Sequence, residues 1–485
     1  MSYIGTQISL PGFLQFGVDP ILDLVQEKAG VNSFRIHADD AIAPNRHLLS
    51  LESESPTFNI AGTPMNPANY RGTSFTPRPF MGAVPAARRM ELFHEIMEKA
   101  HARGMTVHAR VIIGPDRERE AFSHLLAIDY TGSPIGRPCW NHPDYRAYLK
   151  GMAEDFFKTA PIKLDGWLQM NEDEGPLSDA FHAHMGKTPA CFCEYCGQRA
   201  HREGLDMDRA KRGYAKLINL GQASASGQDP WSDGGLIGLL RIFQEFPEIL
   251  GWQQMQQLAN EETMRLVKGV MKLCHPAAEL GHHVVHMASF TPVSMAGYDY
   301  SRLAEFCDHL CPLMYHSQSG NRFSSRVTSL KQRLFPNIPE EDFVRGYYYL
   351  MGLDPAKHPS WKELRDGDLQ VEDYVKKETA RVVRAANGRA KVYSNVGWET
   401  EDGVPAKDVK QTRTYRAVTA AIEAGADGIF LCRTFAPGLF FGETNVQTAV
   451  TWNAGAESGA MIEGDVGPNS LAAYGAALKD AGWVS

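Results

Sequence analysis

Residues 164–175 read LDGWLQMNEDEG, a mostly apolar run that ends abruptly in one amide and three acidic side chains. The run follows Lys163 and is short enough to form one buried β-strand. Buried parallel strands that carry a carboxylate at their C-terminal end are typical of (β/α)8 barrels, where they present catalytic groups. The stretch therefore predicts a barrel strand that ends in Asn171 and Glu172.

Strand-like runs alternate with amphipathic helix-like runs along most of the chain, which is typical of a parallel sheet covered by helices. The predicted strands are residues 12–17, 31–37, 105–113, the run after Lys163, 282–287, 309–316, 390–399 and 428–433. Residues 342–350 fit a strand or a helix, and we interpret them as a helix because a ninth strand would not fit the barrel. Eight strands predict an α/β protein, a (β/α)8 TIM barrel formed by residues 1–485 as a single catalytic domain.

Two long segments interrupt this alternation. Residues 43–84 are rich in Pro, Gly and Asn and predict a long loop at the catalytic face, where long loops are usually functional. Residues 198–273 predict a mostly helical insertion after strand four, broken by a Gly- and Ser-rich piece at 221–235. We also expect Asp19 and Pro20 to cap and open a helix over residues 21–29.

Composition excludes several classes of protein. The 485 residues are 43% hydrophobic and 22% charged, with a formal net charge of -8, and a nucleic-acid-binding protein would usually carry a basic face. No segment approaches the roughly 20 apolar residues of a membrane span, and residues 1–14 do not resemble a signal peptide. We therefore expect a soluble cytoplasmic enzyme without a nucleic-acid or membrane partner. A homodimer is one option for its assembly.

Three cysteines lie within six positions, in CFCEYC at residues 191–196. Zinc accepts four thiolates in a tetrahedron, and closely spaced cysteines commonly supply them. Cys191, Cys193 and Cys196 offer three ligands, and Cys139 in the loop after strand three is the natural fourth. We predict a structural Zn²⁺ that joins two catalytic-face loops. The alternative is a set of small buried thiols without metal.

Two carboxylates follow predicted strands that lie on different sides of the barrel mouth. Glu172 leaves strand four and Glu399 leaves strand seven, so the pair can flank a bound sugar. Cleavage of glycosidic bonds commonly uses such a pair, one as proton donor and the other as nucleophile or base. The alternative is that both are ordinary polar residues at strand ends. Asp173, Glu174, Glu401 and Asp402 lie near enough in sequence to exchange roles with them.

The predicted strand ends also carry many cationic or titratable side chains. Individually each fits a core residue, but together they exceed what a neutral sugar requires, and they indicate an acidic sugar. Arg433 is the best candidate for binding its carboxylate. The predicted substrate contacts are Asn171, Arg35, His37, Arg110, Tyr315, Asn395 and Arg433.

These features together resemble the family 42 β-galactosidases and related barrel hydrolases. The resemblance is carried by Asn171-Glu172 at the end of strand four, by CFCEYC, and by RPCWNHP at residues 137–143. It implies a retaining glycoside hydrolase with Glu172 as acid/base, Glu399 as nucleophile, and zinc on the four cysteines. The spacing from Asn-Glu to the cysteines is longer here, and we expect no separate C-terminal β domains after the barrel, so the resemblance does not imply a substrate.

A looser resemblance is to the inverting sialidases of family 156, which are also barrels. It implies an Asp after strand one and a His after strand three as catalytic residues, positions that Asp19 and His142 could match. Asp19 is equally well explained as a helix cap, and His142 as a structural loop residue. A third alternative is a non-hydrolytic barrel that binds carbohydrate, or a lyase or epimerase acting on an acidic sugar.

Overall fold

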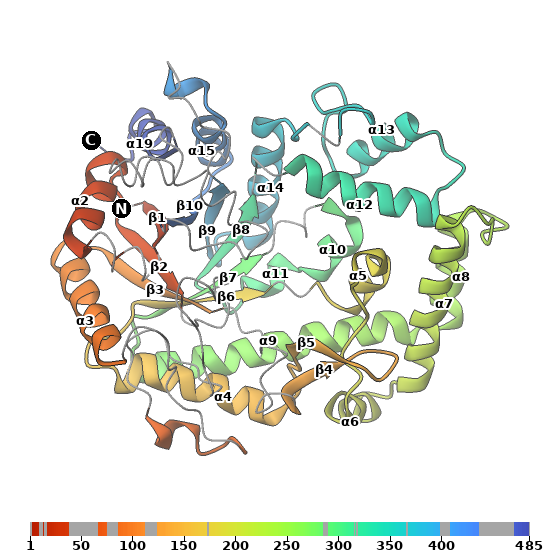
Figure 1. The fold of residues 1–485 in the computed structure, drawn as a ribbon, viewed down its shortest axis with the longest axis horizontal. Coiled ribbons are helices and arrows are strands. Elements are labelled where there is room, and N and C mark those ends of the chain that lie inside the picture. The colour runs from red at the N-terminus through yellow and green to blue at the C-terminus, as the bar shows by residue number, and fades with distance from the viewer. Residues whose placement is uncertain are drawn as a thin grey trace.

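Eight parallel strands close into a barrel in the order β1-β10-β9-β8-β7-β6-β3-β2, surrounded by helices (Figure 1). The fold is a (β/α)8 TIM barrel, as the sequence predicts. The computed structural model describes residues 2–8, 13, 17–37, 66–74, 86–111, 124–171, 174–284, 290–314, 316, 319–364, 367–397, 408–435 and 470–484.

Strands and helices alternate along the chain. The barrel strands are β1 (Tyr3–Ile8), β2 (Ser33–His37), β3 (Thr106–Val111), β6 (Gly166–Asn171), β7 (Glu279–Val284), β8 (His309–Met314), β9 (Lys391–Gly397) and β10 (Gly428–Phe435). Outside the barrel, β4 (Leu126–Ile128) and β5 (Pro134–Pro138) pair antiparallel. The α-helices are α2 (Val18–Ala29), α3 (Ala86–Ala102), α4 (Pro143–Glu154), α5 (Pro176–Phe181), α6 (Glu194–Arg202), α7 (Met207–Ala225), α8 (Gly235–Glu245), α9 (Glu248–Cys274), α10 (Pro292–Gly297), α11 (Tyr300–Leu303), α12 (Ser319–Leu334), α13 (Glu340–Leu350), α14 (Val371–Ala386), α15 (Arg413–Glu423) and α19 (Ser470–Asp480). The helix predicted at residues 342–350 is confirmed as α13.

The first predicted strand, residues 12–17, is wrong. The first barrel strand is β1, and Gly17 is the residue that precedes α2. In the middle of β1, Thr6 and Gln7 are buried, and Thr6 Oγ1 donates a hydrogen bond to the backbone oxygen of Leu431 at 3.3 Å. Prediction from apolar runs misses a strand whose buried side chains are polar but hydrogen-bonded. Asp19 therefore lies in the first turn of α2 and does not cap it.

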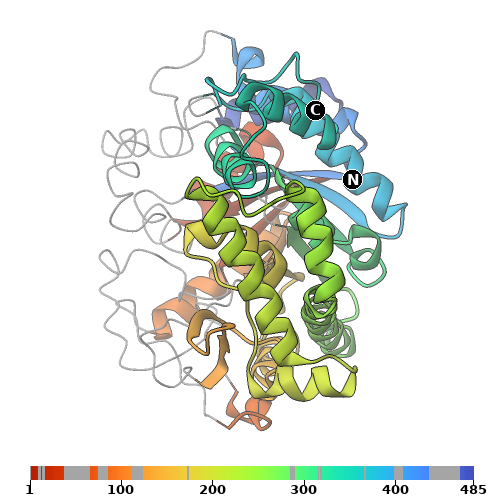
Figure 2. The same cartoon turned by 90° about the vertical axis from the view of Figure 1, so that its right-hand side faces the viewer.

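The predicted helical insertion after strand four is confirmed. It comprises α6, α7 and α8 and continues into α9, which leads to β7. The insertion lies beside the barrel, where α7 packs against α9 and α12 (Figure 2). The strand predicted at residues 282–287 begins earlier than expected, at Glu279, and residues 285–287 lie outside the described residues. Among the described helices, none is both long and apolar enough to cross a membrane.

Aromatic rings fill the N-terminal end of the barrel interior. The rings of Tyr3 and Tyr393 stack with their centroids 4.1 Å apart, and the His309 ring stacks on Tyr393 at 4.7 Å. A glycine on the neighbouring strand makes room for the histidine, because a Cβ atom on Gly281 would lie 2.0 Å from Nε2 of His309. The packed rings thus close this end of the barrel interior, and their packing requires a glycine at position 281.

We expect Gly281→Ala to lower the free energy of unfolding by about 1–3 kcal/mol, because overpacking a well-filled core forces side chains to shift. The measurement is urea denaturation followed by circular dichroism. Gly346→Ala is the matched control: Gly346 lies in α13 with no atom within 4 Å of an added Cβ. This control should be neutral or stabilising by up to about 1 kcal/mol, since Ala favours helix over Gly. Equal urea midpoints for Gly281→Ala and the wild type would contradict the packing argument.

Candidate functional site

The C-terminal ends of β6 and β9 frame the predicted catalytic site. β6 ends at Asn171 and β9 ends at Gly397, and the two strands run parallel in one closed barrel. In the strand order β7 and β8 lie between them. The two strand ends therefore share one rim of the barrel without being neighbours. In sequence, Glu172 directly follows the first of them and Glu399 comes two residues after the second.

Several predicted site residues fall outside the part of the chain that the structure describes. Residues outside it are Glu172, Tyr315 and Glu399. The backbones of Asn171, His37 and Arg433 belong to β6, β2 and β10, but their side chains are not among the described ones. The roles of these six residues stay predictions from the sequence.

Glu174, just beyond β6, is the centre of a buried ion cluster. Its Oε1 atom contacts Nη2 of Arg326 at 2.9 Å and Nζ of Lys187 at 3.1 Å. Ser178 Oγ donates a hydrogen bond to Oε2 at 2.7 Å, and Ser294 Oγ donates to the same oxygen. Burial raises the pKa of Glu174, but the charges of Lys187 and Arg326 together with the hydrogen bond from Ser294 lower it by more, and the pKa falls to about 2. The carboxylate is therefore ionised at neutral pH and cannot act as a proton donor.

This cluster gives Glu174 a structural role that the sequence did not reveal. Ser178, Ser294 and Arg326 belong to α5, α10 and α12, so the carboxylate joins three helices to the chain that leaves β6. Arg326 is 152 positions from Glu174 in sequence. No local spacing marks such a pair, and the sequence had left Glu174 able to exchange roles with Glu172. The geometry supports a structural role for Glu174, which anchors these helices to the chain that leaves β6.

The structure brings Cys139, Cys191, Cys193 and Cys196 together. Their sulfur atoms all lie within 4.8 Å of one another, and Sγ of Cys139 is 3.5 Å from Sγ of both Cys193 and Cys196. A tetrahedral site with metal–sulfur bonds of about 2.3 Å requires sulfur–sulfur separations of about 3.8 Å. The four thiols therefore match the size of a metal site.

The β4–β5 hairpin and the N-terminus of α6 position these thiols. Cys139 directly follows β5, and in β4 the backbone N–H of Ile128 donates to Sγ of Cys191 at 3.3 Å. Cys193 immediately precedes α6 and Cys196 lies in its first turn, at the end of the helix where the dipole favours a negative charge. Hydrogen bonding with Cys139 lowers the pKa of Cys193. Hydrogen bonding among the thiols raises the pKa of Cys139, and burial raises the pKa of Cys191, so Cys193 is the sulfur that the cluster favours as a thiolate.

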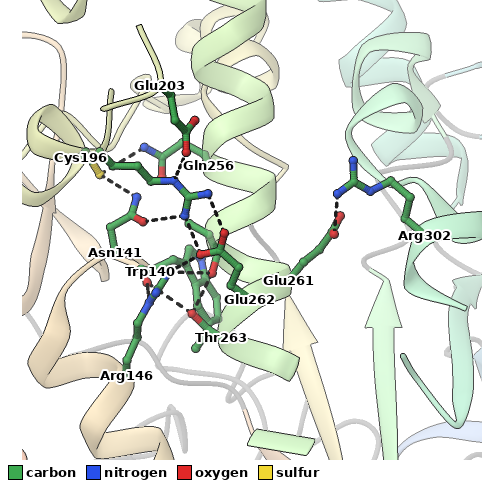
Figure 3. Close-up of polar contacts among 12 residues, drawn as sticks. Trp140, Asn141, Arg146, Cys196, Glu203, Gln256, Glu261, Glu262, Thr263 and Arg302 are labelled. Atoms are coloured by element: carbon green, nitrogen blue, oxygen red, sulfur yellow. Dashed lines mark hydrogen bonds and ion pairs between the residues drawn. The ribbon is translucent and has the colours of Figure 1, made fainter. Parts of the chain in front are cut away.

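Polar side chains from the segment before α4, from α6 and from α9 lie around Cys196 (Figure 3). Asn141 Nδ2 and Gln256 Nε2 each donate to Sγ of Cys196 at 3.3 Å. Arg199 Nη1 donates to Oδ1 of Asn141 at 3.1 Å and to Oε2 of Glu262 at 2.8 Å. The contacts from Asn141 and Gln256 hold the sulfur atom of Cys196 in place from two sides. Neither Asn141 nor Gln256 was a candidate in the sequence: Asn141 lies in the RPCWNHP motif but is not a cysteine, and Gln256 is far from any cysteine motif.

Asp19 and His142, the pair implied by the sialidase resemblance, have other partners. Asp19 lies on the outer helical layer with its side chain 45% exposed, and its oxygens contact Lys99 Nζ at 2.5 Å and Arg103 Nη2 at 2.7 Å. His142 is the N-cap of α4, where Nδ1 accepts a hydrogen bond from the backbone N–H of Asp144 at 3.2 Å. Ion pairs with Lys99 and Arg103 account for the side chain of Asp19, and capping of α4 accounts for that of His142.

Arg35 and Asn395 point into the barrel interior. Arg35 Nη1 donates to Oδ1 of Asn395 at 3.0 Å, and Nη2 donates to Sγ of Cys311 at 3.0 Å. The guanidinium carbon lies 3.6 Å from the ring centroid of Phe430. These contacts favour a core role for Arg35 and Asn395 over binding of substrate. Arg110 in β3 is also buried, and it pairs in register with His37 of β2.

A cavity of about 780 Å³ opens at the opposite end of the barrel, at the N-terminal ends of the strands. Among its lining residues, Asp165 and Asp427 accept hydrogen bonds from the backbone N–H groups of Val107 and Val392, at 2.7 and 3.0 Å. These carboxylates therefore hold strand ends. Active sites of TIM barrels lie at the C-terminal face, so we do not place the site in this cavity.

The fold is similar to that of a solved β-galactosidase from the Antarctic haloarchaeon Halorubrum lacusprofundi. That protein is 13% identical, with a TM-score of 0.54 over 100% of this chain and 58% of that chain. A β-galactosidase from Marinomonas ef1 (12% identity, TM-score 0.46, 97% and 61% covered) and an exo-β-1,4-mannosidase from Opitutaceae bacterium strain TAV5 (10%, 0.42, 99% and 60%) are more distant. No protein-family model and no curated protein sequence matches. The likeness shows a shared fold, and this chain spans about three fifths of those proteins.

We expect Glu174→Gln to lower the free energy of unfolding at pH 7 by about 3–5 kcal/mol, because it removes the negative charge that pairs with buried Arg326 at 2.9 Å. The folded-state pKa of Glu174, about 2, is below its ordinary value of 4.5, so its stabilisation is present above pH 4.5 and is lost as the pH falls toward 2. Urea denaturation between pH 2 and 7 measures both effects. Glu340→Gln, at an exposed position in α13, is the control. Equal stability of Glu174→Gln and wild type at pH 7 would contradict this structural role of Glu174.

Proposed function

We propose that this protein is a glycoside hydrolase in which Glu172 is the acid/base and Glu399 the nucleophile. The observation that carries the proposal is the position of β6 in the barrel. β6 is the fourth barrel strand in chain order, and it ends in Asn171 immediately before Glu172. β9 is the seventh and ends shortly before Glu399 at the same rim. The fold likeness to a solved β-galactosidase supports the same class of reaction.

In the proposed mechanism, Glu399 attacks the anomeric carbon while Glu172 gives its proton to the departing glycosidic oxygen. Water then attacks the covalent intermediate, loses a proton to Glu172, and releases the sugar with retained configuration. This double displacement requires the two carboxyl groups to be about 5–5.5 Å apart. Asn171 would hydrogen-bond a sugar hydroxyl beside the bond being cut.

The substrate is proposed as a glycoside whose sugar is either neutral or acidic. Arg35 is not a candidate for binding the carboxylate of an acidic sugar, because its guanidinium already contacts Asn395 and Cys311. Arg433 and Arg110 are the remaining candidates for binding a sugar carboxylate. A panel of aryl galactosides, mannosides, uronides and sialosides therefore tests both classes. Loss of uronide turnover in Arg433→Ala, with galactoside turnover retained, would identify the acidic class.

We further propose that the four cysteines hold a structural Zn²⁺. Support comes from the sulfur separations, from the hydrogen-bond donors to Cys191 and Cys196, and from the α6 N-terminus. Bound zinc would join the β4–β5 hairpin to α6 and so stabilise two connections of the barrel. It would take no part in the chemistry at the strand ends.

We expect Glu399→Ala to lower kcat on every active aryl glycoside by at least 10³-fold, since it removes the nucleophile. Glu172→Ala should impair substrates with poor leaving groups far more than activated aryl glycosides, which need little proton donation. Proton NMR of the first-formed sugar should show the retained anomer. Glu340→Ala, on α13, is the control with normal activity. An inverted product, or full activity in Glu399→Ala, would refute the mechanism.

For zinc, elemental analysis of the purified protein should find about one ion per chain, and Cys193→Ser should lose most of it. Because zinc binding contributes to folding, the melting temperature of Cys193→Ser should also fall. Cys274→Ser is the matched control, since Cys274 lies at the end of α9, outside the four-cysteine cluster. Full zinc content in Cys193→Ser would show that the cluster does not bind the metal.

A further inference from the structure

We infer that Gln253 and Gln256 of α9 are positioning residues that couple the four-cysteine cluster to the chain segment leaving β6. The structural part of this coupling stands on contacts among described residues. Its catalytic part rests on the proposed function, because that segment begins two residues after Glu172 in sequence.

Gln256 is the contact at the cluster end. Its side chain is buried, and Nε2 donates to the backbone oxygen of Cys191 at 3.1 Å and to Sγ of Cys196 at 3.3 Å. Trp252, one turn earlier in α9, donates from Nε1 to the same Cys191 oxygen at 3.1 Å. Figure 3 shows Gln256 reaching Cys196 from α9. Any metal that fixes the positions of Cys191 and Cys196 therefore also fixes this part of α9.

Gln253 is the contact at the other end. Its Oε1 accepts a hydrogen bond from the backbone N–H of Leu177, in the first turn of α5, at 2.9 Å. Its Nε2 donates to the backbone oxygen of Glu174 at 3.3 Å. One amide side chain thus binds both a donor and an acceptor of the 174–177 backbone. It satisfies an N–H at the start of α5 that the helix itself leaves without a partner.

Gly175 makes this close approach feasible. Gly175 has φ of +85°, and a Cβ atom there would lie 2.3 Å from Nε2 of Gln253. A residue with a side chain would both strain the backbone and displace the amide. The segment between Glu174 and α5 is therefore shaped to receive Gln253.

The two glutamines are three positions apart, so both project from the same side of α9. A helix is a rigid connection over one turn, and displacement of Gln256 is passed to Gln253. A second connection runs parallel to it: Arg137 Nη2 donates to Oδ2 of Asp179 in α5 and to the backbone oxygen of Ala190, both at 3.1 Å. Arg137 and Ala190 lie beside Cys139 and Cys191 in sequence. Order at the cluster thus reaches α5 by two routes.

Hydrogen–deuterium exchange tests the coupling without any assumption about activity. In metal-loaded protein, Gln253→Met should raise exchange of the peptide 174–181 at least tenfold and leave the metal content unchanged. Gln256→Met should raise exchange of both 174–181 and 191–200. Gln257→Met is the matched control, because the neighbouring amide donates to the backbone oxygen of Gly297 in α10 instead, at 2.6 Å. Its exchange at 174–181 should equal that of the wild type.

Removal of the metal gives a second arm. A zinc chelator should raise exchange at 174–181 in the wild type and in Gln257→Met, and should raise it less in Gln253→Met, where one of the two routes is already lost and only the Arg137 route remains. The coupling is overturned if Gln256→Met leaves 174–181 unchanged in metal-loaded protein. It is equally overturned if chelation raises 174–181 exchange as much in Gln253→Met as in the wild type. The metal-loaded comparison decides alone if the chelated protein unfolds.

Turnover tests the catalytic part. On an aryl glycoside with a poor leaving group, Gln253→Met should lower kcat about tenfold with KM nearly unchanged, and Gln257→Met should match the wild type. If the wild type cleaves no glycoside, the proposed function fails while the exchange experiment still decides the coupling. If the wild type is active and Gln253→Met is equally active, the positioning role fails while the proposed function stands.

Discussion

Closure of the sheet is the constraint on which this structure depends. β1 pairs with β10 from Tyr3 opposite Gly428 to Ile8 opposite Phe435, and on its other side with β2, so the ring has no free edge. The register shifts between Thr6 and Gln7, where the strand adapts to the curvature. Because all eight strands run parallel, their C-terminal ends meet at one rim, and chemistry delivered by distant segments converges there.

A closed ring must also be filled, and this barrel is filled partly by polar groups. Arg35 is 1% exposed, and the charge of its guanidinium is stabilised by contacts with Asn395, Cys311 and the face of the Phe430 ring. Burying a charge costs several kcal/mol unless hydrogen bonds and favourable contacts compensate. Burial raises the pKa of Cys311, but the nearby charges of Arg35 and His309 lower it overall. A cationic strand residue can thus belong to the core even though it reads as a ligand-binding group.

Outside the ring, buried polar contacts hold the connections that follow β6. The ionised Glu174 joins α5, α10 and α12, and the amides of α9 join the cysteine cluster to the same segment. Rigid support for the chain next to a strand end is what a catalytic carboxylate requires, since small displacements of a reacting group cost large factors in rate. Fold similarity alone does not supply a function, and these local contacts connect the barrel to the chemistry we propose.

The local pattern of the sequence determined the barrel, the helical insertion and the set of four cysteines, whereas residues 342–350 fitted a strand or a helix and were assigned as α13 only from the strand count. Alternation of strands and helices and the CxCxxC spacing are short-range signals, and they do not depend on contacts between residues that are distant in sequence. Only the tertiary structure decided that β1 is residues 3–8, that Arg35 pairs with Asn395, and that Glu174 pairs with Arg326. Those partners are 360 and 152 positions apart in sequence. A buried polar group forms its hydrogen bonds with the residues that closure of the barrel places next to it. No short-range pattern in the sequence encodes which residues those are.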